Sequence, residues 1–435
     1  MSRTKGNGNI WIDSIFGTVF IYLFMYLVSN ISAFKIFDAF DSIGQALEDM
    51  EMTDIAFSQM RSQPEMDNNI ILVNIGNLPR AGIAEQIRIL DKYEPKVIGL
   101  DSFFKGYVGD TLGTLSLANA INSAKTDIVM VAKVEQSDSL AAVSAGEEIY
   151  DQLYVSDPIF TSNVEFAIAN LDTDAEFQED VKICRKFPSF RTVIGGERQV
   201  AFGAKLASKL NPDAINTLVA RDNEFETINY RGDFYNFYNK DTTVFKRFAA
   251  LDFDEVLGEN FDPSFVKGKI VIMGFIGADF LDMYSWEDKF FTPLNKKMAG
   301  RANPDMYGPV IHANIASMVL NDDYVDTLSD TTEFIIGIIL CYFNVLLFSV
   351  IYRKMGAWYD GLTKLIQVIE VILLLFLIIQ LFASYSFKLE LSIGLFAVAL
   401  AGDLLEVYYG VIRNAVMKIW SRIGFRRKKL ADKGT

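Results

Sequence analysis

Histidine and cysteine are scarce in this chain: its 435 residues include one histidine, His312, and two cysteines. Cys184 lies in a polar region and Cys341 in an apolar run, so we expect no disulfide and no cysteine-rich zinc site. With no second histidine, a transition-metal site at His312 is not expected either. Internal repeats and low-complexity tracts are also missing. We therefore predict no resident metal or cofactor.

Apolar residues are abundant and concentrated. They form 51% of the sequence, with a mean hydropathy of +0.20. Four runs have about the 17–25 residues that cross a membrane, at 10–28, 334–351, 365–382 and 391–405. No small-residue cleavage site follows the first run, so we expect it to be retained. The sequence predicts one transmembrane helix within 10–33 and three within 331–410.

Basic residues flank these runs unevenly. Arg3 and Lys5 precede the first run, Arg353 and Lys354 follow the second, and a basic tail follows the fourth. The positive-inside rule then places residues 1–9 and 411–435 in the cytoplasm and 34–330 outside. We expect the inner membrane of a bacterium, with a periplasmic domain. The tail is expected to contact anionic membrane lipid, the alternative being a docking site for a partner.

The region between the first two runs is strongly acidic. Residues 38–330 hold 26 basic and 47 acidic side chains, a net charge of −21. Such a surface repels phosphate backbones and anionic headgroups, so no nucleic acid is expected as a partner. The region reads as a water-exposed domain held outside the membrane.

Short apolar strands alternate with helical patterns in this region. Buried strands are predicted at Ile70–Ile75, Val97–Leu100 and Ile128–Val131, with helices near 83–93 and 112–121 between them. The alternation predicts an α/β domain with a mainly parallel sheet. The remaining predicted elements are strands at Val164–Ala169, Val181–Phe187, Thr227–Tyr230 and Lys269–Gly274 and helices at Asp41–Met60, Glu197–Leu210, Phe253–Leu257 and Val310–Leu320.

An ordered set of segments resembles the type-2 CHASE domain, a sensory extracellular module. The segments are Leu78–Arg80, Val97–Asp101, Gln199–Leu210, Ile228–Gly232, Lys267–Gly274, Asp288–Leu294 and Gly308–Asn314. The resemblance covers about residues 10–410, including one span before the domain and three after it. It implies a sensor that signals through its spans.

Two features depart from that family. Its usual Trp-Pro turn is reduced here to Leu78-Pro79-Arg80. Its usual cytoplasmic effector, a cyclase or a kinase, has no counterpart in the basic segment after the last span. We therefore expect the signal to pass to a separate signalling partner, with a homodimer as the expected assembly.

Candidate ligand-binding residues follow the strands. Asp101 ends one strand, and Gly274, Gly277 and Asp279 form the turn after another. Ligands of open parallel sheets bind at such carboxyl ends. The alternatives are a tight glycine turn and carboxylates that cap helices; a Mg²⁺ or Ca²⁺ site with Asp282 is a third.

Two further segments complete the candidate set. Asp288–Leu294 contains Thr292 and is expected to be an extended loop that, with Tyr284 and Trp286, either covers a ligand or packs in the core. His312 begins the last helix of the domain, where we expect a neutral imidazole hydrogen-bonded to a neighbouring loop. Ligand contact is its alternative role.

Glu370 and Asp403 lie in the apolar runs and Glu406 directly follows the last one; helix–helix hydrogen bonding is favoured there over an ion pathway. No set of nucleophile, base and stabiliser can be assembled, so an enzyme is not expected. The sequence predicts a membrane-anchored sensor, the alternative being a structural or assembly subunit of a cell-envelope complex.

Overall fold

The computed structural model describes residues 9–29, 52–106, 110–141, 149–171, 183–236, 245–281, 288–296, 303–355 and 357–413. The chain divides into two compact units. The globular unit is Asp49–Val325, and the helical unit combines Met1–Glu48 with Asp326–Thr435. Each is described by itself.

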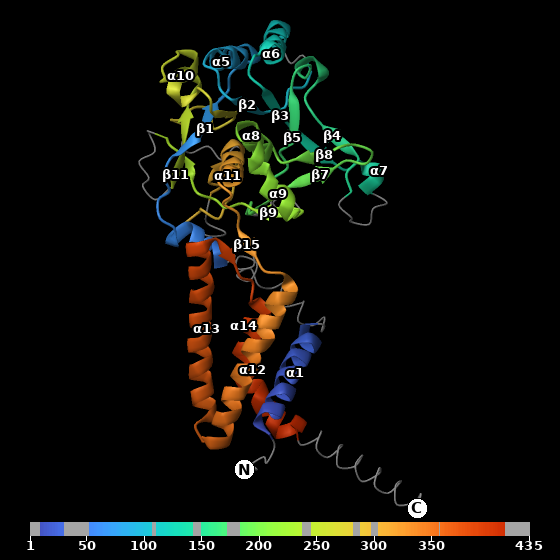
Figure 1. Ribbon diagram of the computed structural model, residues 1–435, viewed down its shortest axis with the longest axis vertical. Coiled ribbons are helices and arrows are strands. Elements are labelled where there is room, and N and C mark those ends of the chain that lie inside the picture. The colour runs from blue at the N-terminus through green and yellow to red at the C-terminus, as the bar shows by residue number, and fades with distance from the viewer. Residues whose placement is uncertain are drawn as a thin grey trace, which may run out of the picture. The chain divides into compact units, whose positions relative to one another are not determined.

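The globular unit is built on an eight-stranded, mainly parallel sheet (Figure 1), as predicted. The strand order is β10-β11-β1-β12-β2-β3-β4, and β5 pairs with β3. Only the β3–β4 pairing in this sheet is antiparallel. The strands are β1 (Asp67–Asn74), β2 (Val97–Asp101), β3 (Ile128–Glu135), β4 (Gln152–Tyr154), β5 (Glu165–Ile168), β10 (Asp233–Phe234), β11 (Lys246–Leu251) and β12 (Ile270–Gly274).

Helices cover both faces of the sheet (Figure 1). On one face lie α5 (Arg80–Lys92), α6 (Thr111–Ser123) and α10 (Phe253–Leu257); on the other lie α8 (Phe202–Leu210) and α11 (Gly308–Leu320). The apolar faces of α5 and α6 pack on Ile71, Val73 and Ile98 of the central strands. Because both faces are covered, the central strands are apolar throughout.

Smaller elements complete the unit. Paired strands are β6 (Lys186–Pro188) with β9 (Phe225–Thr227), β7 (Phe190–Thr192) with β8 (Arg198–Val200), and β13 (Lys289–Phe290) with β14 (Met306–Tyr307). Short helices are α4 (Met52–Ile55), η1 (Ala56–Met60), α7 (Asp138–Ala141), η2 (Pro158–Phe160), η3 (Pro212–Ala214), α9 (Ile215–Arg221) and η4 (Pro263–Phe265).

Several predicted boundaries are wrong. The helix predicted from Glu197 begins at Phe202, because Arg198–Val200 pair with β7 as a strand. The strand predicted at Thr227–Tyr230 is instead β9, Phe225–Thr227, because Glu226 pairs with Phe187 of β6. Of the helix predicted at Asp41–Met60, only the part from Met52 is described; the strand predicted at Val181–Phe187 likewise falls partly outside the described residues.

In its described residues, the helical unit contains four helices that are long and apolar enough to cross a membrane. They are α1 (Ile10–Ser29), α12 (Asp330–Lys354), α13 (Tyr359–Tyr385) and α14 (Ser392–Val407), the last continuing as the π-helix η5 (Tyr408–Ile412). One precedes the globular unit in sequence and three follow it, as predicted. In addition, β15 (Asp326–Thr327) pairs with β16 (Phe387–Lys388).

Polar contacts tie these helices together. Arg353 and Arg413 contact Asp13 at 2.6 and 3.2 Å, which joins α1 to α12 and to the segment after η5. The Gln367 amide donates to the Ala399 carbonyl, Glu370 is hydrogen-bonded to Asn344, and Lys364 pairs with Asp403. These are the helix–helix contacts that the sequence favoured.

The closest approach of α12 and α14 depends on two glycines. A Cβ on Gly394 would lie 2.9 Å from the Gly337 Cα. Gly394→Leu should therefore push these helices apart and lower the free energy of unfolding by about 1–3 kcal/mol. Gly361→Leu is the control, because nothing lies within 4 Å of that position. Thermal loss of helical circular dichroism in detergent measures both; equal melting temperatures would contradict the packing described.

Candidate functional site

Three strands end in one row at the carboxyl edge of the sheet. Asn74 of β1 pairs with Gly274 of β12, and Gly274 pairs with Asp101 of β2. Two of these residues were predicted as ligand-binding, and the register places them side by side. Asn74 was missed, since a single asparagine ending an apolar run carries no distinctive signal.

The Asn74 side chain holds the edge closed. Its amide donates to Asp252 Oδ1 at 2.8 Å and to the Gly277 carbonyl at 3.1 Å. Its Oδ1 accepts the backbone N–H groups of Gly76 and Ile276, each at 2.9 Å. Asn74 is fully buried, so these bonds satisfy groups that would otherwise be costly to bury. The turn after Gly274 is thus fixed by these hydrogen bonds and has a structural role.

Helix α11 closes the same edge from the other side. A Cβ on Gly274 would lie 2.5 Å from Pro309 Cγ and 3.2 Å from Asp101 Cβ, so only glycine fits beside the first turn of α11. Gly277 has a φ of +96°, and a Cβ there would lie 2.9 Å from the Tyr307 hydroxyl. Gly274 and Gly277 therefore serve the contact between this turn and α11.

His312 packs in the core beside Asp101. Its ring meets Phe202 edge-on at 5.2 Å, and its Nε2 lies 4.0 Å from Asp101 Oδ2. Nδ1 is buried without a hydrogen-bond partner, so the predicted bond to a neighbouring loop is wrong; ring packing takes its place. Burial lowers the pKa of His312 to about 3, which keeps the imidazole neutral.

Asp101 is a perturbed carboxylate at this edge. Its side chain is 18% exposed. Burial, and then the charge of Asp288, raise its pKa to about 7, while Lys133 acts in the opposite direction. Perturbed carboxylates mark functional positions often enough to make Asp101 a candidate ligand contact.

Of the other predicted residues, Asp288 lies close enough to Asp101 for its charge to act on that carboxylate, while Thr292 and Asp279 have other contacts. Thr292 is buried and donates from its hydroxyl and N–H to Asp305 at 2.6 and 2.8 Å, which closes its own loop. Asp288 is exposed, with a φ of +57°, just before β13. Asp279 lines a groove next to β11 and accepts the N–H of Leu281.

Two alternatives from the sequence, the cation site and the aromatic cover, include residues outside the described ones: Asp282, Tyr284 and Trp286. Among the described residues, no three His, Cys, Asp or Glu side chains are placed to hold a metal ion.

A second cluster, which we call the linker clasp, consists of Arg61, Asn229, Tyr230, Arg231 and Asp323. Arg61 follows the segment through which the chain enters the globular unit; it donates to Asn229 Oδ1 at 2.6 Å and to the Tyr230 carbonyl at 3.0 Å. Asp323 lies on the segment that leaves the unit; it accepts two bonds from Arg231, both at 2.7 Å, and one from Asn229. The segment 229–231 thus holds both connections.

Helix α11 is bonded directly to the clasp. Asn314 Oδ1 accepts the N–H of Arg231 at 2.9 Å, and its amide donates to the Gly232 carbonyl at 2.9 Å. Burial, and then Arg231, lower the pKa of Arg61 to about 9, which leaves it charged at neutral pH. One buried helix therefore runs from the Asp101 edge to the clasp. The sequence analysis identified Ile228–Gly232 and Gly308–Asn314 as separate segments but did not predict the hydrogen bonds between them.

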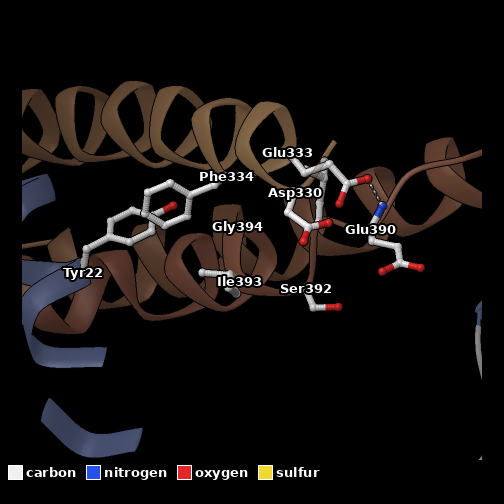
Figure 2. A pocket seen from close by; sticks show the side chains of 9 residues that line it. Tyr22, Asp330, Glu333, Phe334, Glu390, Ser392, Ile393 and Gly394 are labelled. Atoms are coloured by element: carbon white, nitrogen blue, oxygen red, sulfur yellow. Dashed lines mark hydrogen bonds between the residues drawn. The ribbon is translucent and has the colours of Figure 1, made fainter. Parts of the chain in front are cut away.

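The helical unit has a cavity of about 360 Å³ near the first turns of α12 and α14. Figure 2 shows Asp330, Glu333 and Glu390 around it, with Glu333 accepting the N–H of Glu390 at 2.8 Å. Tyr22 of α1 meets Phe334 edge-on at 5.5 Å. These contacts join the helix ends, which suits a packing role for the cavity wall.

Comparison with known proteins gives one finding. The family model of the CHASE2 domain matches residues 34–350, well over half of the chain. No curated protein and no solved structure matches the chain.

Loss of the Asn74 side chain should destabilise the globular unit. Asn74→Ala removes one donor from Asp252 and the donor to the Gly277 carbonyl, and it leaves the buried N–H groups of Gly76 and Ile276 without their acceptor. The free energy of unfolding should therefore fall by about 2 kcal/mol or more. Asn69→Ala, at an exposed position of β1, is the matched control. Denaturant titration followed by tryptophan fluorescence measures both. Equal midpoints would refute the role given to Asn74.

Asp101 and His312 should act oppositely on the pH dependence of stability. Between about pH 4 and 7 the folded chain keeps the Asp101 proton that the unfolded chain loses, so rising pH lowers stability. Between about pH 3 and 6.5 the unfolded chain protonates His312 while the folded chain does not, so rising pH raises stability. Asp233 and Asp305, whose pKa values burial raises to about 7 and 6, add to the Asp101 trend.

The two substitutions should therefore tilt the profile in opposite directions. Asp101→Asn should raise the slope of unfolding free energy against pH, between pH 4.5 and 6.5, by up to about 1 kcal/mol per pH unit. His312→Gln should lower it by a similar amount while leaving the fold intact. Denaturant midpoints across this range are the measurement. Parallel profiles for both variants and the parent chain would contradict the assigned burial.

Proposed function

The chain belongs to the CHASE2 domain family, and on that premise we propose that it is a membrane-anchored sensor that signals to a separate partner protein. CHASE2 is a family of sensory domains, so the globular unit is a sensory domain, placed in sequence between the first and the later apolar helices. The proposal concerns what that domain does with a signal.

The linker clasp is the observation that carries the proposal. One short segment, 229–231, bonds to Arg61 on the way into the sensory domain and to Asp323 on the way out. A ligand that favours another position of this segment would displace both connections together. A receptor works in this way, by binding one of two existing states more tightly.

The pairing of β15 with β16 supports a relay into the helices. The chain leaves the sensory domain at Val325, and the N–H of the next residue, Asp326, donates to the Ser386 carbonyl at 3.0 Å. Ser386 directly follows α13, so a displacement of Asp326 would act on the α13–α14 connection as well as on α12. Sensory input would thus reach three helices through one short strand.

We place the protein in a bacterial inner membrane, with both termini cytoplasmic and the sensory domain periplasmic. The basic residues around the apolar helices support this orientation. The proposal includes a homodimer, contact of the basic tail with anionic lipid, and no catalytic step by this chain. Its test asks which proteins accompany the chain in its native membrane.

Affinity purification of the full-length chain from native membranes, followed by mass spectrometry, should recover a stoichiometric partner with a cyclase, kinase or regulator domain. Asn229→Ala breaks a bond on each side of the clasp, so it should leave that partner bound but change its output. Asn69→Ala is the control. Recovery of envelope machinery without signalling domains would contradict the sensor and favour an assembly subunit.

A further inference from the structure

A groove of about 860 Å³ runs along the outer edge of β11 in the sensory domain. Its floor is Ala249–Leu251, the second half of that strand. The walls are rich in aromatic side chains from the α10–η4 segment and from the segments next to β10 and β12; these are Phe253, Phe261, Phe265, Tyr235 and Phe280. The groove shares Asp252 with the Asn74 hydrogen bonds at the carboxyl edge of the sheet, and none of the linker-clasp residues lines it.

The floor of the groove is an open strand edge. β10 covers only the first half of β11, pairing with Lys246 and Phe248, and the Tyr235 N–H donates to the Phe248 carbonyl at 2.8 Å. Beyond Phe248, none of the described strands pairs with this side of β11. An edge of this kind presents unpaired backbone groups to any chain that lies beside it.

The register shows which backbone groups face the groove. The Ile75 N–H bonds to Gly274 of β12, so alternate residues of β1 face β12 and Leu72 faces β11. Leu72 lies opposite Ala250, so its bonds go to the residues on either side of Ala250. The N–H and C=O of Ala250 therefore point outward, as do those of Phe248, whose carbonyl bonds to Tyr235.

Large apolar side chains are exposed around this edge. Met66, Tyr235, Phe265 and Leu281 are 42, 46, 42 and 62% exposed, and all four line the groove. A contiguous exposed apolar patch rimmed by polar residues marks an interaction site more often than isolated exposed residues do.

The rim of the groove is acidic. Among the described residues, five carboxylates line it and no lysine or arginine does; the carboxylates are Asp252, Asp254, Glu255, Asp262 and Asp279. Among the described residues, Asp254, Glu255 and Asp262 form no ion pair. Hydrogen bonds from Ser264 lower the pKa of Asp262, which keeps it charged. Two lysines lie near the groove, Lys246 over the Tyr235 ring and Lys269 over the Phe265 ring. They are fewer than the five carboxylates, so the rim has an acidic excess.

We propose that this groove binds an extended, basic segment of a partner protein, which adds a strand beside β11. The Ala250 N–H and C=O would bond to the added backbone, alternate apolar side chains would fill the aromatic walls, and lysine or arginine would face the carboxylates. This inference goes beyond the sensor role and does not depend on relay, because the groove would bind whether or not binding is transmitted.

The test uses the full-length chain in phosphatidylcholine nanodiscs and a phage library of random nine-residue peptides. Enriched peptides should combine lysine or arginine with alternating apolar residues. Proline has no backbone N–H to donate, so a peptide with proline in place of its central residue should bind about tenfold more weakly. Fluorescence anisotropy measures the affinity. No enrichment over empty nanodiscs, or enrichment of acidic peptides, would overturn the proposal.

Variants of the groove locate the binding. Ala250→Pro removes the outward N–H without touching the bonds to β1, and Phe265→Ala removes part of a wall; each should weaken binding about tenfold. Leu112→Ala is the control, since Leu112 is 79% exposed on α6 and lies outside the groove. Circular dichroism checks the fold of each variant.

Unchanged affinity in a folded Phe265→Ala or Ala250→Pro variant would overturn the proposal. Self-association of the parent chain that Ala250→Pro abolishes would assign the groove to a second copy and would also contradict it.

Discussion

The ion pair between Arg231 and Asp323 is the contact on which the sensory domain's connections depend. Its two parallel bonds fix the segment that leaves the domain, and the neighbouring Asn229 amide bonds to the same carboxylate. Such a fork is directional, and removing one partner leaves the other without both hydrogen bonds. Arg61 donates to Asn229 Oδ1 and to the Tyr230 carbonyl of the same segment. The entering and the leaving connection of the domain are therefore both bonded to residues 229–231.

Helix α11 gives this anchor a path to the rest of the sheet. The helix is almost entirely buried, with Pro309 against Gly274 at one end and Asn314 bonded to the backbone of Arg231 and Gly232. A packed helix moves as a unit, so a shift of α11 at the carboxyl edge of the sheet would also displace Asn314 and the backbone of Arg231. The edge itself is held shut by Asn74 and Asp252. The β11 groove is where the domain offers open backbone and exposed aromatic rings together.

The fold was predictable from the sequence because its signals are periodic. Apolar runs at 70–75 and 269–274 specify central strands, and long apolar runs specify the four helices. Boundaries failed where pairing overrode local pattern: Arg198–Val200 continues a helical pattern in sequence but bonds to β7.

The candidate site was only partly predictable. The strand-end rule brought Asp101 and Gly274 to one edge, since carboxyl ends of parallel strands meet there. It could not find Asn74, Arg61 or Asp323, whose partners lie 160 residues or more away for the first two and about 90 for the third. It also could not separate Asp279 and Thr292 from that edge, because loop direction is set by contacts that sequence spacing does not encode.

Hydrogen–deuterium exchange of the full-length chain in nanodiscs tests the shared anchor most directly. Asp323→Ala is compared with the parent chain and with Asp322→Asn, its exposed neighbour. The account predicts faster exchange at both 52–61 and 321–325 in Asp323→Ala and at neither in the control. Faster exchange at 321–325 alone, with 52–61 unchanged, would show that the two connections are independent and would contradict the coupling proposed here.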